Sequence, residues 1–109
     1  MGHAALKKGG TLADIGALYL LPEIYSVTPS AQGCEECLKL GDEWVHLRIC
    51  LICGQVGCCD NSKNKHATKH FHATQHPLIQ SFEPGEDWIW CYVDNVALET
   101  GQILYEVAP

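Results

Sequence analysis

Cysteines and histidines form an ordered run of metal-ligand pairs between residues 34 and 76. Two Cys-x2-Cys pairs are followed by a lone cysteine, a His-x3-His pair and a last histidine: Cys34, Cys37, Cys50, Cys53, Cys58, His66, His70 and His76. A Cys-x2-Cys pair on a tight turn lets two thiolates reach one tetrahedral Zn²⁺. Eight donors suffice for two four-coordinate sites, so the sequence predicts that the domain is held together by two zinc ions.

Composition limits what such a domain can be. With 109 residues the chain has room for one small domain, whose core is too small to be comfortably stable without a metal or a crosslink. The formal net charge of −6 disfavours nucleic acid as a partner. The cysteine count of 7 is odd, and the cysteines are interleaved with histidines, unlike a secreted disulfide framework. We therefore expect a reducing, cytoplasmic location.

Residues 1–28 precede the ligand run and are expected to be a variable N-terminal arm. Their apolar stretch superficially resembles a signal peptide, but Asp14 interrupts it and Pro22 follows without a clean cleavage site. The stretch is also shorter than the roughly 20 residues needed to cross a bilayer, so we expect no membrane partner. The arm either docks on the core or stays mobile. Residues 29–109 are expected to form the zinc-binding domain.

The segments between the ligands predict a small α+β fold in which one main helix packs on an antiparallel sheet. Residues 44–50 are rich in β-formers and predict a strand that enters the second cysteine pair. Gly54 and Gly57 predict the turns that bring Cys53 and Cys58 round. Three further strands are expected, at residues 78–83, 88–94 and 102–107.

The main helix is expected over residues 64–74. Residues 61–64 supply candidates for its N-cap, and Pro77 ends the element and leaves His76 in the exit loop. His66 and His70 are one turn apart on one face of this helix. That closeness favours a shared metal, although neighbouring turns can also feed two adjacent metals.

Spacing alone leaves two ways to divide the ligands. In a zinc-ribbon arrangement the two Cys-x2-Cys pairs share one metal, and Cys58 joins the three histidines around the other. In an interleaved arrangement the first cysteine pair joins Cys58 and His66, while the second pair joins His70 and His76. The residues by themselves do not choose between these arrangements.

Further motifs around the ligands resemble a known family. They are Trp44, Cys50-Leu51-Ile52-Cys53-Gly54, Val56-Gly57-Cys58, His66-Ala67-x2-His70-Phe71, His76-Pro77-Leu78 and Trp90-Cys91-Tyr92. Together they resemble the UBP-type zinc finger, the ubiquitin-binding finger of ubiquitin-specific proteases and of one cytoplasmic histone deacetylase. The resemblance covers roughly residues 33–95. Residues 57–60 and 81–88 are similar to the bacterial branch of that family, which consists mostly of small stand-alone proteins.

The resemblance implies the interleaved pairing, because the ligands interleave in the multi-zinc members. The first site would then use Cys34, Cys37, Cys58 and His66, and the second would use Cys50, Cys53, His70 and His76. A third zinc is not expected, since only Cys91 matches the ligands of a third site and Asp94 stands where its second cysteine would be. The resemblance also implies a non-catalytic module that binds a protein or peptide tail.

One substitution changes the expected tail pocket. Ubiquitin-binding relatives place an arginine two residues after the cysteine that matches Cys58, where it pairs with the free carboxylate of a diglycine tail. This chain has Asp60 there, which argues against recognition of ubiquitin tails. Trp90 and Tyr92 match positions that line the tail pocket, and together with Trp44 they are the candidate peptide-binding residues. The same rings can instead fill the interior.

The competing functions are less well supported. Four protein ligands per zinc leave no open position for water, and no nucleophile–base arrangement or phosphate-binding loop appears, so we expect no enzyme. The alternative is a zinc-dependent nucleic-acid-binding or regulatory protein, which the net charge disfavours. Cys59 and Cys91 are expected to be small buried residues, and His46 and His72 are expected to be solvated.

Overall fold

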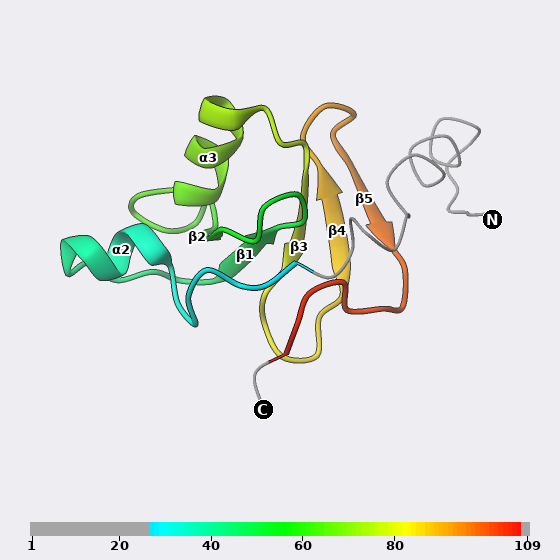
Figure 1. Cartoon of the computed structure of the whole chain (residues 1–109). Helices are drawn as coiled ribbons and strands as arrows, with labels where there is room; N and C mark the ends of the chain where they lie inside the picture. The colour runs from blue at the N-terminus through cyan, green and yellow to red at the C-terminus, as the bar shows by residue number, and fades with distance from the viewer. Residues whose placement is uncertain (1–26, 108–109) are drawn as a thin grey trace.

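The computed structural model describes residues 27–107, so almost all of the expected arm at residues 1–28 lies outside the described residues. Within this range five strands form one antiparallel sheet, and two helices pack at its β2–β1 end (Figure 1). The strand order is β2 (Val56–Cys58), β1 (Leu47–Cys50), β3 (Leu78–Ser81), β4 (Trp88–Cys91) and β5 (Val96–Glu99). The helices are α2 (Glu35–Leu40) and α3 (His66–Thr74). The predicted α+β fold with an antiparallel sheet is confirmed.

Strand register divides the side chains between two faces of the sheet. Residues directly opposite each other in an antiparallel pair point to the same face. Ile49 lies opposite Gln80, so these side chains share the core face. Arg48 lies opposite Gly57, and an added Cβ at Gly57 would meet the backbone of Ala67 in α3 at 2.8 Å. Arg48 therefore lies on the face that α3 covers.

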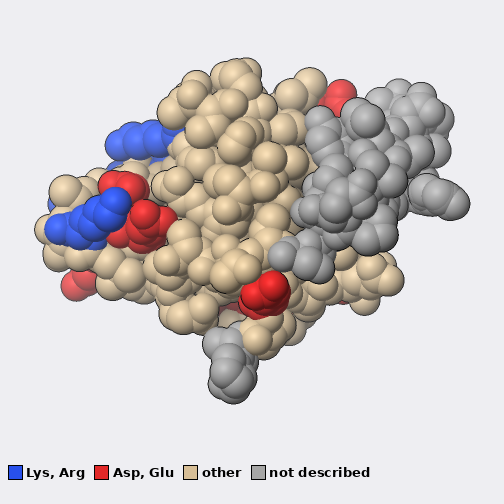
Figure 2. Space-filling view, in the orientation of Figure 1, with Lys and Arg blue, Asp and Glu red and all other residues tan. Residues whose placement is uncertain are grey.

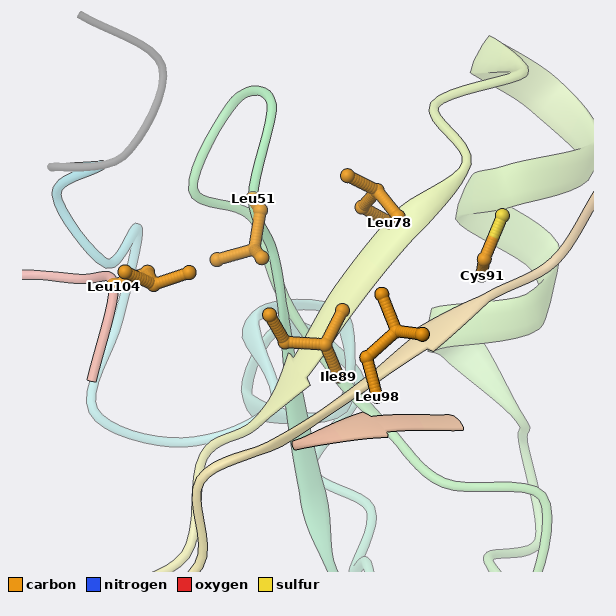
Figure 3. Close-up of a cluster of buried hydrophobic side chains, with 6 residues drawn as sticks. All are labelled: Leu51, Leu78, Ile89, Cys91, Leu98 and Leu104. Atoms are coloured by element: carbon orange, nitrogen blue, oxygen red, sulfur yellow. The ribbon is translucent and has the colours of Figure 1, made fainter. Parts of the chain in front are cut away.

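The main apolar core lies on the first of these faces. Its buried side chains come from β3, β4, β5 and the segments beside them: Leu51, Leu78, Ile89, Cys91, Leu98 and Leu104 (Figure 3). In β4 the alternation is visible, because Ile89 and Cys91 are buried while Trp88 and Trp90 are only partly buried. The two tryptophans consequently face the α3 side of the sheet.

A second buried cluster joins the cysteines to the sheet. It contains Cys34, Cys37, Leu47, Ile49, Val56 and Cys58, and Trp44, Phe82 and Tyr105 pack against it. Trp44 lies over Gly33, where an added Cβ would meet the indole ring at 2.7 Å. The cysteine-rich end is thus part of the interior.

Within residues 27–107 no helix combines the length and the apolar character that crossing a bilayer requires.

The predicted strand at residues 102–107 is wrong. Only Tyr105 pairs there, through an isolated parallel bridge to Val27, and the fifth strand is β5. The cause is Gln80, whose buried side chain donates from Nε2 to the Gln102 carbonyl at 2.8 Å. Its Oε1 also accepts from the Leu104 N–H at 2.9 Å. One side chain thus satisfies backbone groups that a neighbouring strand would otherwise have paired.

Helix α2 was not expected from the sequence. Glu35 and Glu36 in its first turn and Lys39 in its last turn complement the helix dipole, and Gly41 ends it with φ of 74°. Cys37, the second cysteine of the first pair, therefore lies inside α2.

Residues 56–58, which were predicted to form a turn around Gly57, are instead strand β2.

Candidate metal centres and the adjoining pocket

The first four ligands of the interleaved pairing converge between α2, β2 and α3. Nδ1 of His66 lies 3.2 Å from Sγ of Cys34, 3.4 Å from Sγ of Cys37 and 3.7 Å from Sγ of Cys58. All four donor atoms lie within 4.8 Å of one another. The three thiols are fully buried, and the imidazole is partly buried. We call this group site 1.

The other four ligands converge beside the turn at residues 51–53, which follows β1. Sγ of Cys50 lies 3.5 Å from Nδ1 of His76, and Sγ of Cys53 lies 3.3 Å from Nε2 of His70. These four donors also fall within 4.8 Å of one another. Gln75 ends α3 with φ of 65°, and this turn brings His76 back toward His70, with ring centroids 5.4 Å apart. We call this group site 2.

Both groups fit a tetrahedral zinc ion. With Zn–S bonds of about 2.3 Å and Zn–N bonds of about 2.0 Å, tetrahedral coordination separates neighbouring donors by roughly 3.3–3.8 Å. The separations between sulfur and nitrogen in both sites are close to this range. The two clusters can therefore each hold one zinc ion, as predicted. His66 serves site 1 and His70 serves site 2, so the shared metal that their helical spacing favoured is not what the structure shows.

Sulfur atoms of site 1 also accept hydrogen bonds from backbone N–H groups at the starts of both helices. The N–H of Cys37 donates to Sγ of Cys34 at 3.4 Å, which caps α2. At α3 the N–H of His66 donates to Sγ of Cys58 at 3.3 Å. Such N–H donors favour the thiolate form of a cysteine. The cysteines of site 1 thus satisfy backbone N–H groups at the starts of both helices as well as being available to bind an ion.

The side-chain caps that were predicted for α3 are absent from its N-terminus. The N-cap residue is Lys65, and its side chain makes no capping hydrogen bond. Asn64, one of the predicted caps, instead donates to Asp42 at 3.0 Å and to Sγ of Cys37 at 3.5 Å. This prediction is therefore wrong, because Asn64 supports a ligand of site 1 rather than the helix.

The two sites differ in exposure and both require proton release. Burial raises the pKa of the Cys34 thiol to about 12 and that of Cys50 to about 11. Zinc must therefore displace protons from both thiols at neutral pH. Burial lowers the pKa of His70, which keeps its imidazole neutral and able to bind metal. Cys53 is exposed, whereas all three thiols of site 1 are buried, so site 2 is the more open centre.

A pocket lies between α3 and the sheet, next to the metal sites. It has a volume of about 200 Å3 and is lined by side chains that include Arg48, Asp60, Thr68, Trp88, Trp90 and Tyr92. Tyr92 stacks on Phe71 of α3 with ring centroids 4.6 Å apart, and burial raises the pKa of its phenol. The phenol therefore stays protonated at neutral pH and lies 3.4 Å from the Thr68 hydroxyl.

The structure places only two of the three candidate peptide-binding residues in this pocket. Trp90 and Tyr92 line it, but Trp44 packs beside site 1 and borders a separate surface hollow with Asp42 and Lys63. Arg48 was missed from the sequence. The signal was its place between Leu47 and Ile49, because strand alternation turns it away from the core that these two residues enter.

The remaining cysteines and histidines lie outside the two sites. Cys59 and Cys91 are buried, with exposed fractions of 5% and 2%. Cys59 lines the pocket, and Cys91 belongs to the apolar core. His46 and His72 are exposed and join neither group of four.

The fold and these two centres define a class, a small zinc-finger domain with two Cys/His sites. A family profile described as "Zn-finger in ubiquitin-hydrolases and other protein" matches residues 34–102. The chain belongs to this family, and the resemblance noted in the sequence is confirmed. The domain that defines the family is a zinc-finger module rather than a catalytic domain.

Known proteins carry a similar segment within much longer chains. BRCA1-associated protein of Homo sapiens is 42% identical over 64 residues, which are 59% of this chain and 10% of that protein. NAD-dependent deacetylase sir2A of Dictyostelium discoideum is 37% identical over 59 residues, 54% of this chain and 10% of that protein. The chain thus spans a small part of these relatives. A solution structure of a protein from Rhodopseudomonas palustris is 60% identical, with a TM-score of 0.71, over 76% of this chain and 81% of that chain.

Proposed function

We propose that the chain is a non-catalytic interaction module that binds a protein or peptide tail in the pocket lined by Trp90 and Tyr92. The observation that carries this proposal is the pocket itself, which places aromatic side chains beside polar groups at a solvent-open surface. Each zinc has four protein ligands available and keeps no position for a substrate, so the metals serve the fold. The whole protein is accordingly proposed to be no enzyme.

The tail is proposed to differ from that of ubiquitin. In ubiquitin-binding fingers of this type an arginine is expected at the position of Asp60, and an aspartate cannot pair with a terminal carboxylate there. Asp60 is exposed, and its carboxylate accepts a hydrogen bond from Thr68 at 2.7 Å. The negative charge therefore stays at the pocket and repels a tail that approaches in the manner of those relatives.

Charge argues against the alternative of nucleic-acid binding. Lysines at the α2 end pair with acidic side chains, as Lys39 does with Glu35 at 3.4 Å and Lys63 does with Asp42 at 3.4 Å (Figure 2). On the face shown, basic side chains form no continuous stripe. A polyanion normally needs such a stripe. The location is proposed to be reducing and cytoplasmic, because five of the seven cysteines belong to the two metal-binding groups and no disulfide joins any cysteine of the described residues.

An NMR titration of the zinc-loaded chain tests the proposal. A panel of short peptides should shift the signals of Trp90 and Tyr92, and Trp90→Ala should remove the binding while leaving both metals in place. Leu40→Ser, which changes an exposed apolar residue on α2, is the matched control and should bind normally. Peptides that shift only residues outside the pocket, or none at all, would contradict the proposal.

A further inference from the structure

The two metal sites differ in how far solvent can reach their cysteines. In site 2 the side chain of Cys53 is exposed, whereas its partner Cys50 is only 1% exposed. In site 1 all three thiols are fully buried, and Cys59 and Cys91 are buried outside the two sites. Cys53 is therefore the one cysteine within residues 27–107 that a solute in water can contact directly.

Close pairs of sulfur atoms occur in both sites, so exposure rather than proximity distinguishes them. The sulfurs of Cys50 and Cys53 lie within 4.8 Å of each other. In site 1 Sγ of Cys37 lies 3.9 Å from Sγ of Cys58. Oxidation of a thiolate begins where an oxidant can contact the sulfur. Site 2 combines such a sulfur with a second sulfur beside it, and site 1 does not.

We propose that Cys50 and Cys53 form an oxidation site, at which hydrogen peroxide converts the two thiolates of site 2 into a disulfide. Cys53 reacts first, because its sulfur forms a bond to one peroxide oxygen while the O–O bond breaks and its electron pair leaves with hydroxide. The sulfur of Cys50 then attacks the sulfur of Cys53, and the S–O bond breaks with loss of a second hydroxide. The two sulfurs lose two electrons, and two protons from solvent convert the hydroxides to water.

This oxidation releases the metal of site 2 and loosens the end of α3. A disulfide supplies no thiolate, so His70 and His76 are the two donors left, and they are too few for a stable zinc site. The buried residue of α3 is Ala67, in its first turn, so burial does little to hold the second half of the helix. The stacking of Phe71 on Tyr92 adds one contact there. In a reducing compartment a dithiol reverses the change, which makes it a switch rather than damage.

Treatment of the full zinc-loaded chain with hydrogen peroxide tests this inference. One of the two zinc ions should be released, and peptide mapping without reduction should find a disulfide between Cys50 and Cys53. A dithiol reductant with added zinc should restore the second ion. Hydrogen exchange should become faster at residues 70–76 and stay unchanged at residues 35–40, which form α2 beside site 1.

Two variants identify the sulfur that reacts. Cys53→His keeps a fourth zinc donor without an oxidisable sulfur, so it should retain both ions in peroxide. Cys59→Ala removes a buried cysteine outside both sites and should still release one ion. Native mass spectrometry before treatment shows whether each variant holds two ions. If Cys53→His holds only one, the disulfide map of the unaltered chain decides the question.

Other outcomes would overturn the inference. They are loss of both ions together, a disulfide in site 1 before one forms in site 2, and retention of both ions at peroxide levels that oxidise a small free thiol. Release of one ion with Cys53 converted to sulfinic acid, and no disulfide to Cys50, would also contradict it. Equal release from the unaltered chain and from a fully loaded Cys53→His variant would place the reacting sulfur elsewhere.

Discussion

Sγ of Cys34 and Nδ1 of His66 lie 3.2 Å apart, although 32 positions separate them in the sequence. Cys34 is the N-cap of α2 and His66 is the first residue of α3, so one zinc ion bound to both would join the starts of the two helices. Cys58 adds the end of β2 to the same centre. In a domain this small, such a centre replaces part of the apolar core that a longer chain would have.

Removing a ligand of site 1 should damage the domain more than removing a ligand of site 2. Cys34→Ser leaves a buried centre incomplete and should cost the fold and its metal, since structural zinc contributes on the order of 10 kcal/mol or more. Cys53→Ser should lose one zinc and retain more structure, because Cys53 is exposed. Native mass spectrometry and thermal unfolding measure both effects.

The matched control for these variants is His72→Ala, an exposed residue of α3 outside both sites. It should keep two zinc ions and change stability by no more than about 0.5 kcal/mol. Equal losses in all three variants would contradict the assignment of the ligands.

Acid should release zinc and unfold the chain. Burial holds the pKa of His70 below its ordinary 6.5, so the folded state binds fewer protons than the unfolded state once the pH falls toward that value. Stability should therefore drop as the pH decreases through about 6.5 and below, and protons compete for the thiolates at the same time. Zinc retention followed from about pH 8 to about pH 5 measures this. Full retention at the lower end would contradict the ligand role of His70.

Gly57→Ala should destabilise the domain through the contact between β2 and α3. The added methyl group would meet the backbone nitrogen of Ala67 at 2.8 Å, so α3 must move with His66. Overpacking of this kind costs about 1–3 kcal/mol. In Gly85→Ala the site is open but φ is +80°, and the cost should be only about 1 kcal/mol. Chemical denaturation measures both, and a Gly57 variant as stable as the Gly85 variant would argue against this packing.

Asp60→Arg should strengthen the binding of peptides that have a free carboxylate. It removes the anion of the pocket and places a second guanidinium near Arg48. We expect about a tenfold gain in affinity, which corresponds to one additional charge-assisted hydrogen bond. Glu99→Arg makes the same change of net charge at an exposed position of β5 and should leave affinity unchanged. A gain in both variants would show that only net charge matters.

The ligand spacing predicted much of this domain because metal chemistry places strict demands on neighbouring residues. Cys-x2-Cys and His-x3-His each bring two donors to one place, and the family resemblance supplied the interleaving that the spacing left open. The helix around His66 and His70 and the strand before Cys50 follow ordinary periodicity. The eight donors and the α+β class were therefore accessible from the residues, whereas the division of the donors between two sites came from the resemblance.

The elements that were missed depend on long-range contacts. Helix α2 is capped by the sulfur of Cys34, which a propensity argument does not treat as a cap. Residues 102–107 have a strand-like composition, but Gln80 takes their hydrogen bonds from 22 and 24 positions away. Arg48 enters the pocket because Trp88 and α3 lie beside it in space. Strand alternation indicates only that its side chain points away from the core that Leu47 and Ile49 enter.

The metal content of the purified chain, measured together with its unfolding before and after chelation, tests whether zinc holds this domain together. We expect two zinc ions per chain by native mass spectrometry and loss of the cooperative unfolding transition when a chelator removes them. A chain that carries no metal and still unfolds cooperatively would contradict this role of zinc.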